Sequence, residues 1–402
     1  MSHIAIALPL LAEWDNLQPL MQLLRSQQTT HETDLFVCVN QPDSWWNDGD
    51  AHLREACNDN QRTLQYLASH GSTAAGCPVH IIDRCSVGNG WSHKHSGVGW
   101  ARKTLLDKIM QQCPDDTVIV SLDADTSFSP TYLASLQQFF ATSGLQAVCV
   151  PYYHAVDDAD IPGTRAMLRY EIYMRHYLVN LLRIHSPYAF CALGSAMAFT
   201  AGAYRHCGGM SPLQAGEDFY LLQRMVKTGV NVALWLPRSH EAVGSEVVLP
   251  QPRPSWRVPF GTGPAVARGL AAVEEQYPLY NPACFDMVGE TYALFPELYD
   301  HDVQTPMTPF LQQQLRRDDL WGSLRKNFKK RELFVHACTE LVDGLRILQY
   351  LHHTHNTAAP APYTIDFHKA PIPEINNLRN QLYQQEMQLR LSSLTNNKLD
   401  EK

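Results

Sequence analysis

The chain has 402 residues, of which 45% are hydrophobic and 18% are charged, and its formal net charge is −8. This length and composition fit a globular protein with one large domain and an appendage, or with two domains. The acidic balance argues against a nucleic-acid-binding protein, which usually presents a basic face. It does not exclude an anionic substrate, because a bound metal ion can reverse the local field.

The cysteines and the start of the chain bear on the compartment. Ten cysteines are scattered without any C-x-x-C pair, which argues against a zinc site and a disulfide framework. We therefore expect free thiols in a reducing, cytoplasmic compartment. The sequence after Met1 runs directly into an apolar segment and lacks the charged region of a signal peptide. The uncharged stretch 186–204 contains Pro187 and Gly194, so we expect buried core rather than a membrane span, and at most a peripheral membrane contact.

Short apolar runs alternate with segments of helical period through the first part of the chain. Buried strands are predicted over 4–8, 35–39 and 118–122, and further strands over 79–82, 147–153 and 231–236. Helices are predicted over 16–27, 55–68, 100–110, 164–183 and 219–226. This alternation predicts a mainly parallel sheet with crossover helices. A Pro-rich loop, 250–264, carries Arg253 and Arg257, and from residue 265 the pattern becomes helical, over 265–276, 309–330 and 333–352.

The strand predicted over 118–122 ends at two carboxylates one residue apart, Asp123 and Asp125. Because side chains alternate along an extended chain, both would point the same way if strand geometry continued. Two carboxylates so placed repel each other unless a cation lies between them. Open α/β sheets bind ligands at the carboxyl ends of their strands, so this is the first candidate site. An acidic turn before the helix that begins near Pro130 explains the same residues without a ligand.

The last part of the chain divides into a spacer and a final helix. We predict an α/β domain over 1–264, a helical accessory region over 265–356, and a linker with a C-terminal helix over 357–402. The spacer is rich in proline and alanine and is expected to be semi-rigid. The helix predicted over 374–394 has one narrow apolar seam, made of Ile375, Leu378, Leu382 and Leu389. Such a seam must pack against another copy of the chain or against its own helical region.

Several segments occur in an order and spacing that matches a known family. They are the strand ending at Pro9, Gly97-Val98-Gly99-Trp100-Ala101-Arg102-Lys103, Asp123-Ala124-Asp125, Gly194-Ser195-Ala196-Met197-Ala198-Phe199, Gly208-Gly209 and Gly216-Glu217-Asp218. Together they resemble glycosyltransferase family 2, inverting nucleotide-sugar transferases of the GT-A fold. The resemblance covers roughly residues 4–245. It implies an α/β GT-A fold, Rossmann-like, with a mainly parallel sheet flanked by helices and a helical C-terminal extension.

The chemistry implied by the resemblance is metal-assisted transfer of a sugar from a nucleotide-sugar donor to a hydroxyl acceptor. The acceptor would be a glycan, a lipid-linked glycan or a small molecule. Asp125 and Asp123 would hold Mg²⁺ or Mn²⁺, cations that prefer oxygen ligands, and Asp123 would also contact the ribose. Asp218 matches the family's general base and Glu217 would position the acceptor. Favourable charge at a helix N-terminus is the alternative for this acidic pair.

Four further residues complete the expected donor side. Pro9 and Asn40 end the first two strands, and Asn40 stands where the family usually has an aspartate that touches the base or ribose. The nucleotide is therefore left open. Arg102 would contact phosphate, with a surface cation on a helix as the alternative. His240 follows the last predicted strand, where some GT-A enzymes place a metal-binding histidine, although a lone histidine is more often packed or exposed.

Two other functions stay open. A retaining GT-A transferase of the mannosylglycerate-synthase type would share the fold and the acidic pair. A catalytically inactive, transferase-like binding protein would share the fold alone. The sequence argues against a Rossmann dehydrogenase, because no G-x-G-x-x-G follows the first strand. We also expect residues from about Thr357 onward to be dispensable for donor binding and needed for self-association as a homodimer.

Overall fold

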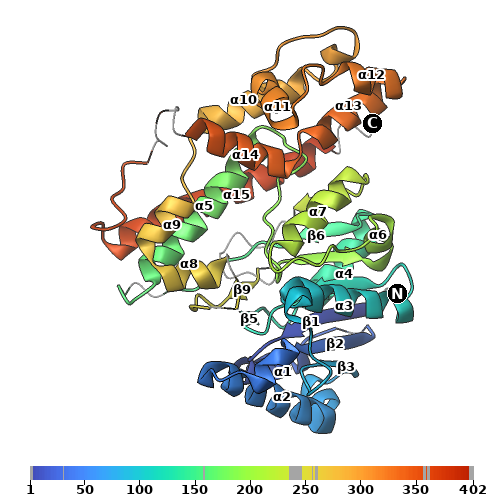
Figure 1. The fold of residues 1–402 in the computed structure, drawn as a ribbon, viewed down its shortest axis with the longest axis vertical. Helices are drawn as coiled ribbons and strands as arrows, with labels where there is room; N and C mark the ends of the chain where they lie inside the picture. The colour runs from blue at the N-terminus through green and yellow to red at the C-terminus, as the bar shows by residue number, and fades with distance from the viewer. Residues whose placement is uncertain are drawn as a thin grey trace. The chain divides into compact units, whose positions relative to one another are not determined.

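The computed structural model describes residues 3–29, 31–156, 159–234, 247–255, 257–258, 261–355, 359 and 363–397. The chain forms two compact units (Figure 1). The sheet unit comprises Met1–Met167 and Phe190–Gly269, and the helical unit comprises Leu168–Ala189 and Leu270–Lys402. The sequence-based boundaries gave three segments, 1–264, 265–356 and 357–402. In the structure residues 168–189 belong with the later helices, residues 265–269 belong to the sheet unit, and the accessory region and the C-terminal helix share the helical unit.

A seven-stranded sheet forms the centre of the sheet unit, in the order β3-β2-β1-β4-β7-β6-β8. Its strands are β1 (Ile4–Leu10), β2 (Thr33–Asn40), β3 (Val79–Arg84), β4 (Val118–Ser121), β6 (Ala147–Cys149), β7 (Met197–Thr200) and β8 (Val232–Leu234). The pairs β1/β2, β1/β4, β2/β3 and β6/β8 are parallel, and β7 runs antiparallel to β4 and β6. The predicted α/β class with a mainly parallel sheet and a helical C-terminal region is confirmed, while the antiparallel strand had no sequence signal.

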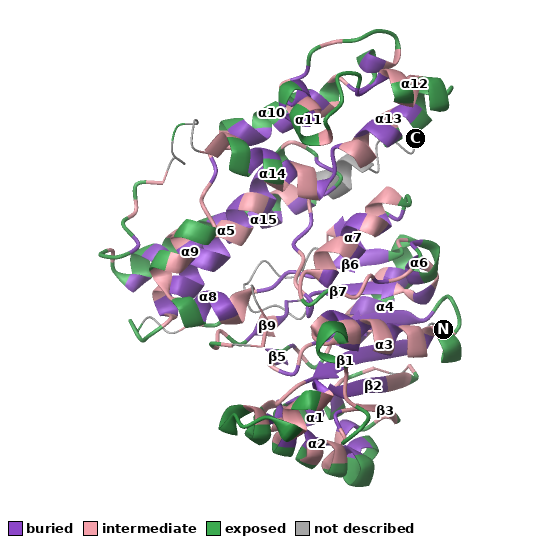
Figure 2. Ribbon diagram, in the orientation of Figure 1, coloured by how far each residue is buried: buried purple, intermediate pink, exposed green. Residues whose placement is uncertain are grey.

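The helices of the sheet unit bury one stripe each against this sheet or against one another. They are α1 (Trp14–Arg25), α2 (Ala51–Ala75), α3 (Val98–Gln112), α4 (Tyr132–Ser143), α6 (Ala201–His206), α7 (Glu217–Lys227), α8 (Thr262–Arg268) and the 3₁₀ turns Asp43–Asn47 and His93–His95. In α1 the buried residues are Leu17, Leu20, Met21 and Leu24, a helical spacing that gives the helix one apolar face. Figure 2 shows buried residues along the inner strands β1 and β4 and exposed residues on the outer surfaces of α1 and α2.

The helical unit contains most of α5 (Thr164–Arg183) and the C-terminal helices. These are α9 (Leu270–Gln276), α10 (Pro282–Ala293), α11 (Thr308–Leu315), α12 (Gly322–Asn327), α13 (Arg331–Leu341), α14 (Gly344–His355), α15 (Ile372–Asn397) and the 3₁₀ turn Glu297–Tyr299. Helices predicted as continuous are broken. Arg316 adopts a left-handed φ of 53° and ends α11, and the Asp343 carboxylate accepts from the Arg346 N–H (3.0 Å) at the start of α14. Gly269, at φ 82°, separates α8 from α9.

The C-terminal helix α15 packs within the helical unit. Ile375 and Leu382 of the predicted seam are buried, and Glu386 accepts from Arg175 of α5 at 2.7 Å. Of the two coverings that the sequence left open, the structure shows the chain's own helical unit. Most of the predicted spacer, residues 356–358 and 360–362, lies outside the described residues. No helix in the described part of the chain is long and apolar enough to cross a membrane.

Candidate active site

The acidic pair lies at the carboxyl end of β4, but its geometry differs from the sequence expectation. Strand β4 ends at Ser121, and the Asp123 carbonyl accepts from the Thr126 N–H at 3.2 Å. The chain therefore turns between these residues, and the extended alternation on which we based a shared direction does not continue. As a result, Asp123 and Asp125 bind different guanidinium groups, Arg102 and Arg253.

Arg102 joins the acidic pair to the second acidic motif. Its guanidinium is buried, forms an ion pair with Asp123, and donates from Nη1 to Glu217 Oε1 at 3.4 Å. One cation of α3 thus connects the end of β4 with the first turn of α7. From the sequence we expected a phosphate contact for Arg102. In the structure its guanidinium is engaged by two carboxylates, and a phosphate contact for Arg102 stays a prediction.

Two glycines make this arrangement sterically feasible. A Cβ added at Gly99 would lie 2.1 Å from the Leu213 carbonyl oxygen, in the loop that leads to α7. A Cβ added at Gly194 would lie 2.3 Å from Arg102 Nη2. The family-like glycines of the sequence therefore permit α3, the loop before β7 and the loop before α7 to meet around Arg102.

Glu217 and Asp218 begin α7 and differ in accessibility. Glu217 is buried, and burial raises the pKa of its carboxyl to about 7 although Arg102 acts in the opposite direction. Burial also raises the pKa of Asp218, again opposed by Arg102. Asp218 is half-buried, and its Oδ1 accepts from the Phe219 N–H at 2.7 Å. Of the two residues, Asp218 is the one that keeps some exposed surface.

A short two-stranded sheet brings the Pro-rich loop beside Asp125. Strand β5 (Thr126–Ser127) pairs antiparallel with β9 (Leu249–Pro250), and the Gln251 N–H donates to the Asp125 carbonyl at 3.0 Å. Arg253 then donates from Nε to Asp125 Oδ2 at 2.8 Å. Burial and the neighbouring Asp123 raise the pKa of the Asp125 carboxyl, whereas Arg253 acts to lower it.

Glu13 anchors the same loop to the start of α1. Its carboxylate pairs with both Arg253 and Arg257 and accepts from Asn16 Nδ2 at 2.6 Å. Arg257 also donates to the Leu11 carbonyl at 2.7 Å. From the sequence, neither arginine had an assigned role and Glu13 was not singled out. Only the two arginines in a Pro-rich loop after the last strand could have pointed to this contact.

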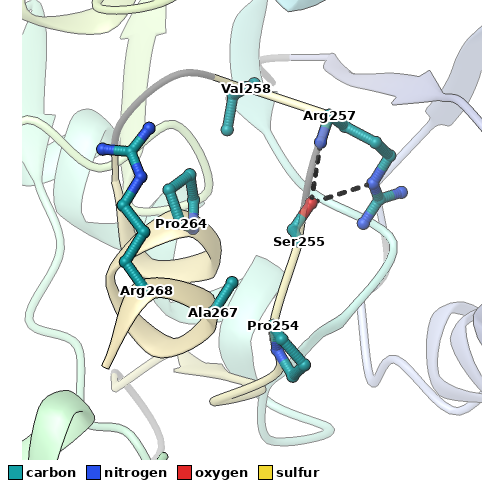
Figure 3. A pocket seen from close by; sticks show the side chains of 7 residues that line it. All are labelled: Pro254, Ser255, Arg257, Val258, Pro264, Ala267 and Arg268. Atoms are coloured by element: carbon teal, nitrogen blue, oxygen red, sulfur yellow. Dashed lines mark hydrogen bonds between the residues drawn. The ribbon is translucent and has the colours of Figure 1, made fainter. Parts of the chain in front are cut away.

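A pocket of about 650 Å³ lies between this loop and α8 (Figure 3). Its wall residues are Pro254, Ser255, Arg257, Val258, Pro264, Ala267 and Arg268. Figure 3 shows Arg257 and Arg268 on opposite sides, with Ser255 Oγ accepting from Arg257 Nε at 3.2 Å. The volume is in the range of about 300–1,000 Å³ that small-molecule sites occupy. Through Arg257 and Glu13, the pocket adjoins the Asp125 end of the site.

Of the other residues expected at the donor side, two lie buried in strands β1 and β2 and one lies outside the described residues. Asn40 is buried and donates from Nδ2 to the Leu10 carbonyl at 2.8 Å, so it joins the ends of β1 and β2. Pro9 lies buried inside β1, paired in register with Cys38. His240 lies outside the described residues. A nucleotide contact for Asn40 or Pro9 stays a prediction.

The acidic pair has the donor chemistry of a Mg²⁺ or Mn²⁺ site but is not a complete ligand set. Carboxylate oxygens suit both ions, and Mg²⁺ usually takes one or two carboxylates together with substrate phosphates and water. In the described part of the chain no group of three His, Cys, Asp or Glu side chains is placed to hold a metal. Asp123 and Asp125 therefore fit an ion whose remaining ligands come from a bound diphosphate and water.

Comparison with known proteins found likeness in structure only. No protein-family model matches this chain, and no curated protein matches its sequence. S. aureus TarS 1-349 in complex with UDP-GlcNAc aligns over 98% of this chain and 92% of its own, with 11% identity and a TM-score of 0.41. The mannosyltransferase PcManGT from Pyrobaculum calidifontis, in complex with GDP-Man and Mn²⁺, aligns over 99% and 88%, with 10% identity and a TM-score of 0.36.

A third structure aligns over a shorter region. Glucosyl-3-phosphoglycerate synthase from Mycobacterium tuberculosis, in complex with Mn²⁺, UDP and glucosyl-3-phosphoglycerate, aligns over 58% of this chain and 69% of its own, with 14% identity and a TM-score of 0.36. Because all three TM-scores are below 0.5, we base no functional argument on these likenesses. The functional assignment rests on the charged side chains that Arg102, Arg253 and Glu13 organise at the edge of the sheet.

Proposed function

We propose that this chain is an inverting, metal-assisted glycosyltransferase that moves a sugar from a nucleotide-sugar donor to a hydroxyl acceptor. The observation that carries the proposal is the pairing of Asp123 and Glu217 with one buried guanidinium, that of Arg102. This contact connects a candidate diphosphate site with a candidate proton acceptor at one edge of the sheet, where open α/β sheets bind ligands.

On the donor side, Asp125 and Asp123 would hold Mg²⁺ or Mn²⁺. The ion would act as a Lewis acid that neutralises the leaving diphosphate. Arg102 fixes the Asp123 carboxylate from the protein interior, so this ligand is oriented before a donor binds. Such preorganisation reduces the rearrangement needed during the reaction.

On the acceptor side, Asp218 is the proposed general base. It would take the proton of the attacking hydroxyl as the bond to the sugar forms. Glu217 is the proposed positioning residue, because its carboxylate is buried against Arg102 and has little surface for an acceptor. Inversion requires a single displacement, in which the acceptor hydroxyl attacks the sugar carbon opposite the leaving diphosphate while a base takes the hydroxyl proton.

Donor binding can be tested with UDP-, GDP-, dTDP- and CMP-sugars, each with and without Mn²⁺. The correct donor should raise the melting temperature by mass action, and only with the metal. Asp125→Ala should abolish this metal-dependent shift while the protein without donor melts as the wild type does. An Asp125→Ala protein that transfers sugar at a near-native rate would contradict the metal assignment. The anomeric configuration of the product, read by NMR, separates inversion from retention.

A further inference from the structure

Asp125 is held by a protein cation in the structure, although it is the residue proposed to hold the metal. Arg253 Nε donates to Asp125 Oδ2 at 2.8 Å, and its Nη2 pairs with Glu13. Burial opposes the charged form of Arg253, but Glu13 and Asp125 together raise its pKa, so it stays a cation. The guanidinium contacts Oδ2 of this carboxylate, whose side chain is 21% accessible, and its positive charge repels a divalent ion that approaches the same group. They therefore compete.

If the Arg253 side chain moves away, its two partners, Glu13 and Asp125, keep different interactions. Glu13 keeps the ion pair with Arg257 and the hydrogen bond from Asn16, so its buried carboxylate stays compensated. Asp125 forms no ion pair with another cation of the described residues, and it would face Asp123, whose charge already opposes its ionisation. Losing Arg253 is therefore tolerable for Glu13 and costly for Asp125 unless another cation arrives.

A metal-bound donor would bring a new partner for Arg253, its diphosphate, and a new cation for Asp125, its metal ion. Each phosphate group of its diphosphate offers pairs of oxygens that the planar fork of a guanidinium can bind with two hydrogen bonds. The loop from Gln251 to Ser255 is fixed beside Asp125 through the β5/β9 pairing, so Arg253 needs only a side-chain movement to reach a group bound there.

Resting on the proposed function, we propose that Arg253 is a latch on Asp125 that the donor diphosphate draws away. In the free protein Arg253 keeps the carboxylate from binding a divalent ion. When the diphosphate engages Arg253, Asp125 becomes available, so the metal and the nucleotide bind cooperatively. Glu13 is the positioning residue that keeps the latch at the site.

The test is Mn²⁺ binding to the full-length protein, measured from the free-ion EPR signal, without nucleotide and with saturating UDP or GDP. In the wild type, the better nucleotide should tighten Mn²⁺ binding. Arg253→Gln should bind Mn²⁺ alone about five- to tenfold more tightly than the wild type, in the lower range of typical coupling between sites, and the nucleotide should add little. Arg253→Lys retains a cation beside Asp125 and should bind Mn²⁺ alone as weakly as the wild type.

Two controls separate this latch from other outcomes. Arg205→Gln removes a surface arginine paired with Asp115 and should leave Mn²⁺ binding unchanged. Asp125→Asn should abolish the site in every background. If Arg253→Gln binds Mn²⁺ no more tightly than the wild type while Asp125→Asn still abolishes binding, the latch is wrong and the proposed function stands. If Asp125→Asn leaves Mn²⁺ binding intact with both nucleotides, the metal site of the proposed function is itself wrong.

Discussion

The two units contain clusters of the same side chains in different surroundings. In the sheet unit, Asp123 and Asp125 pair with arginines and remain 36% and 21% exposed. In the helical unit, Glu171 and Glu386 pair with arginines and are fully buried. The first cluster is open to solvent, as the proposed exchange of a guanidinium for a ligand requires, whereas the second is closed to solvent. Exposure, rather than residue type, separates a candidate binding site from a structural network.

In the buried network of the helical unit, arginines contact both oxygens of each carboxylate. Glu386 accepts from Arg175 at 2.7 Å on one oxygen and from Arg390 at 2.5 Å on the other. Glu171 accepts from Arg175 at 2.6 Å and from Arg379 at 3.3 Å. Every carboxylate oxygen is used, which is the condition under which buried charges are tolerated. The network joins α5 to α15, so it also explains why residues 168–189 belong to the helical unit.

The comparison predicts that function and stability can be lost separately, and the largest effect is expected at Asp218. Asp218→Asn should lower kcat by about 10²–10⁴-fold, the usual contribution of a general base. The free energy of unfolding should stay close to the wild-type value, because the amide oxygen can still accept from Phe219. Donor titration and steady-state kinetics measure the two quantities. A variant that loses donor affinity with kcat unchanged would make Asp218 a binding residue rather than the base.

In the helical unit the corresponding change should act on stability. Glu386→Gln leaves the buried guanidiniums of Arg175 and Arg390 without a full counter-charge, which should cost about 3–5 kcal/mol. Urea unfolding measures the loss, and hydrogen exchange should locate it in α5 and α15. Glu374→Gln, at an exposed position of α15, is the matched control and should change little. Equal losses in the two variants would mean that the network is no more than surface charge.

A third prediction concerns how stability depends on pH through Glu217, a carboxylate of the sheet unit that is nevertheless buried. Its pKa is raised from 4.5 to about 7 in the folded protein, so the folded state retains this proton to higher pH than the unfolded chain. The wild type should therefore lose unfolding free energy relative to Glu217→Gln as pH rises from about 5 to about 8, by on the order of 1–3 kcal/mol. Urea unfolding across this range tests it. If the wild type instead gains unfolding free energy relative to Glu217→Gln as pH rises, then Arg102 lowers the pKa of Glu217 by more than burial raises it.

The smallest effect is expected for an ion pair at the surface of the sheet unit. Arg205 and Asp115 interact at 2.9 Å, with both side chains more than half exposed. Arg205→Gln should change the free energy of unfolding by less than about 1 kcal/mol, since solvent and salt screen such a pair. Urea unfolding at low and high salt measures it. If Arg205→Gln lowers the free energy of unfolding as much as Glu386→Gln does, exposure is not the property that distinguishes the two clusters.

Local pattern was sufficient for a large part of the fold. The apolar runs of β1, β2, β3 and β4 and the helical periods of α1, α3 and α5 were predicted within a few residues, because each depends on neighbours along the chain. The position of the acidic pair at the end of β4 follows from the same reasoning. Breaks such as Arg316 and Asp343 were missed, since a single residue that ends a helix hardly changes the hydrophobic period.

The contacts that define the site and the units depend on tertiary structure. Arg102 lies 115 residues from Glu217, Arg253 lies 240 residues from Glu13, and Arg175 lies 211 residues from Glu386. No periodicity links residues at such separations, and the sequence alone gave none of these arginines its carboxylate partner. The order of the strands, the pairing of β5 with β9 and the packing of α15 on α5 bring the charges together. Burial then decides which pairs are fixed and which can open, because the energy of an ion pair depends on the solvent that the rest of the fold leaves around it.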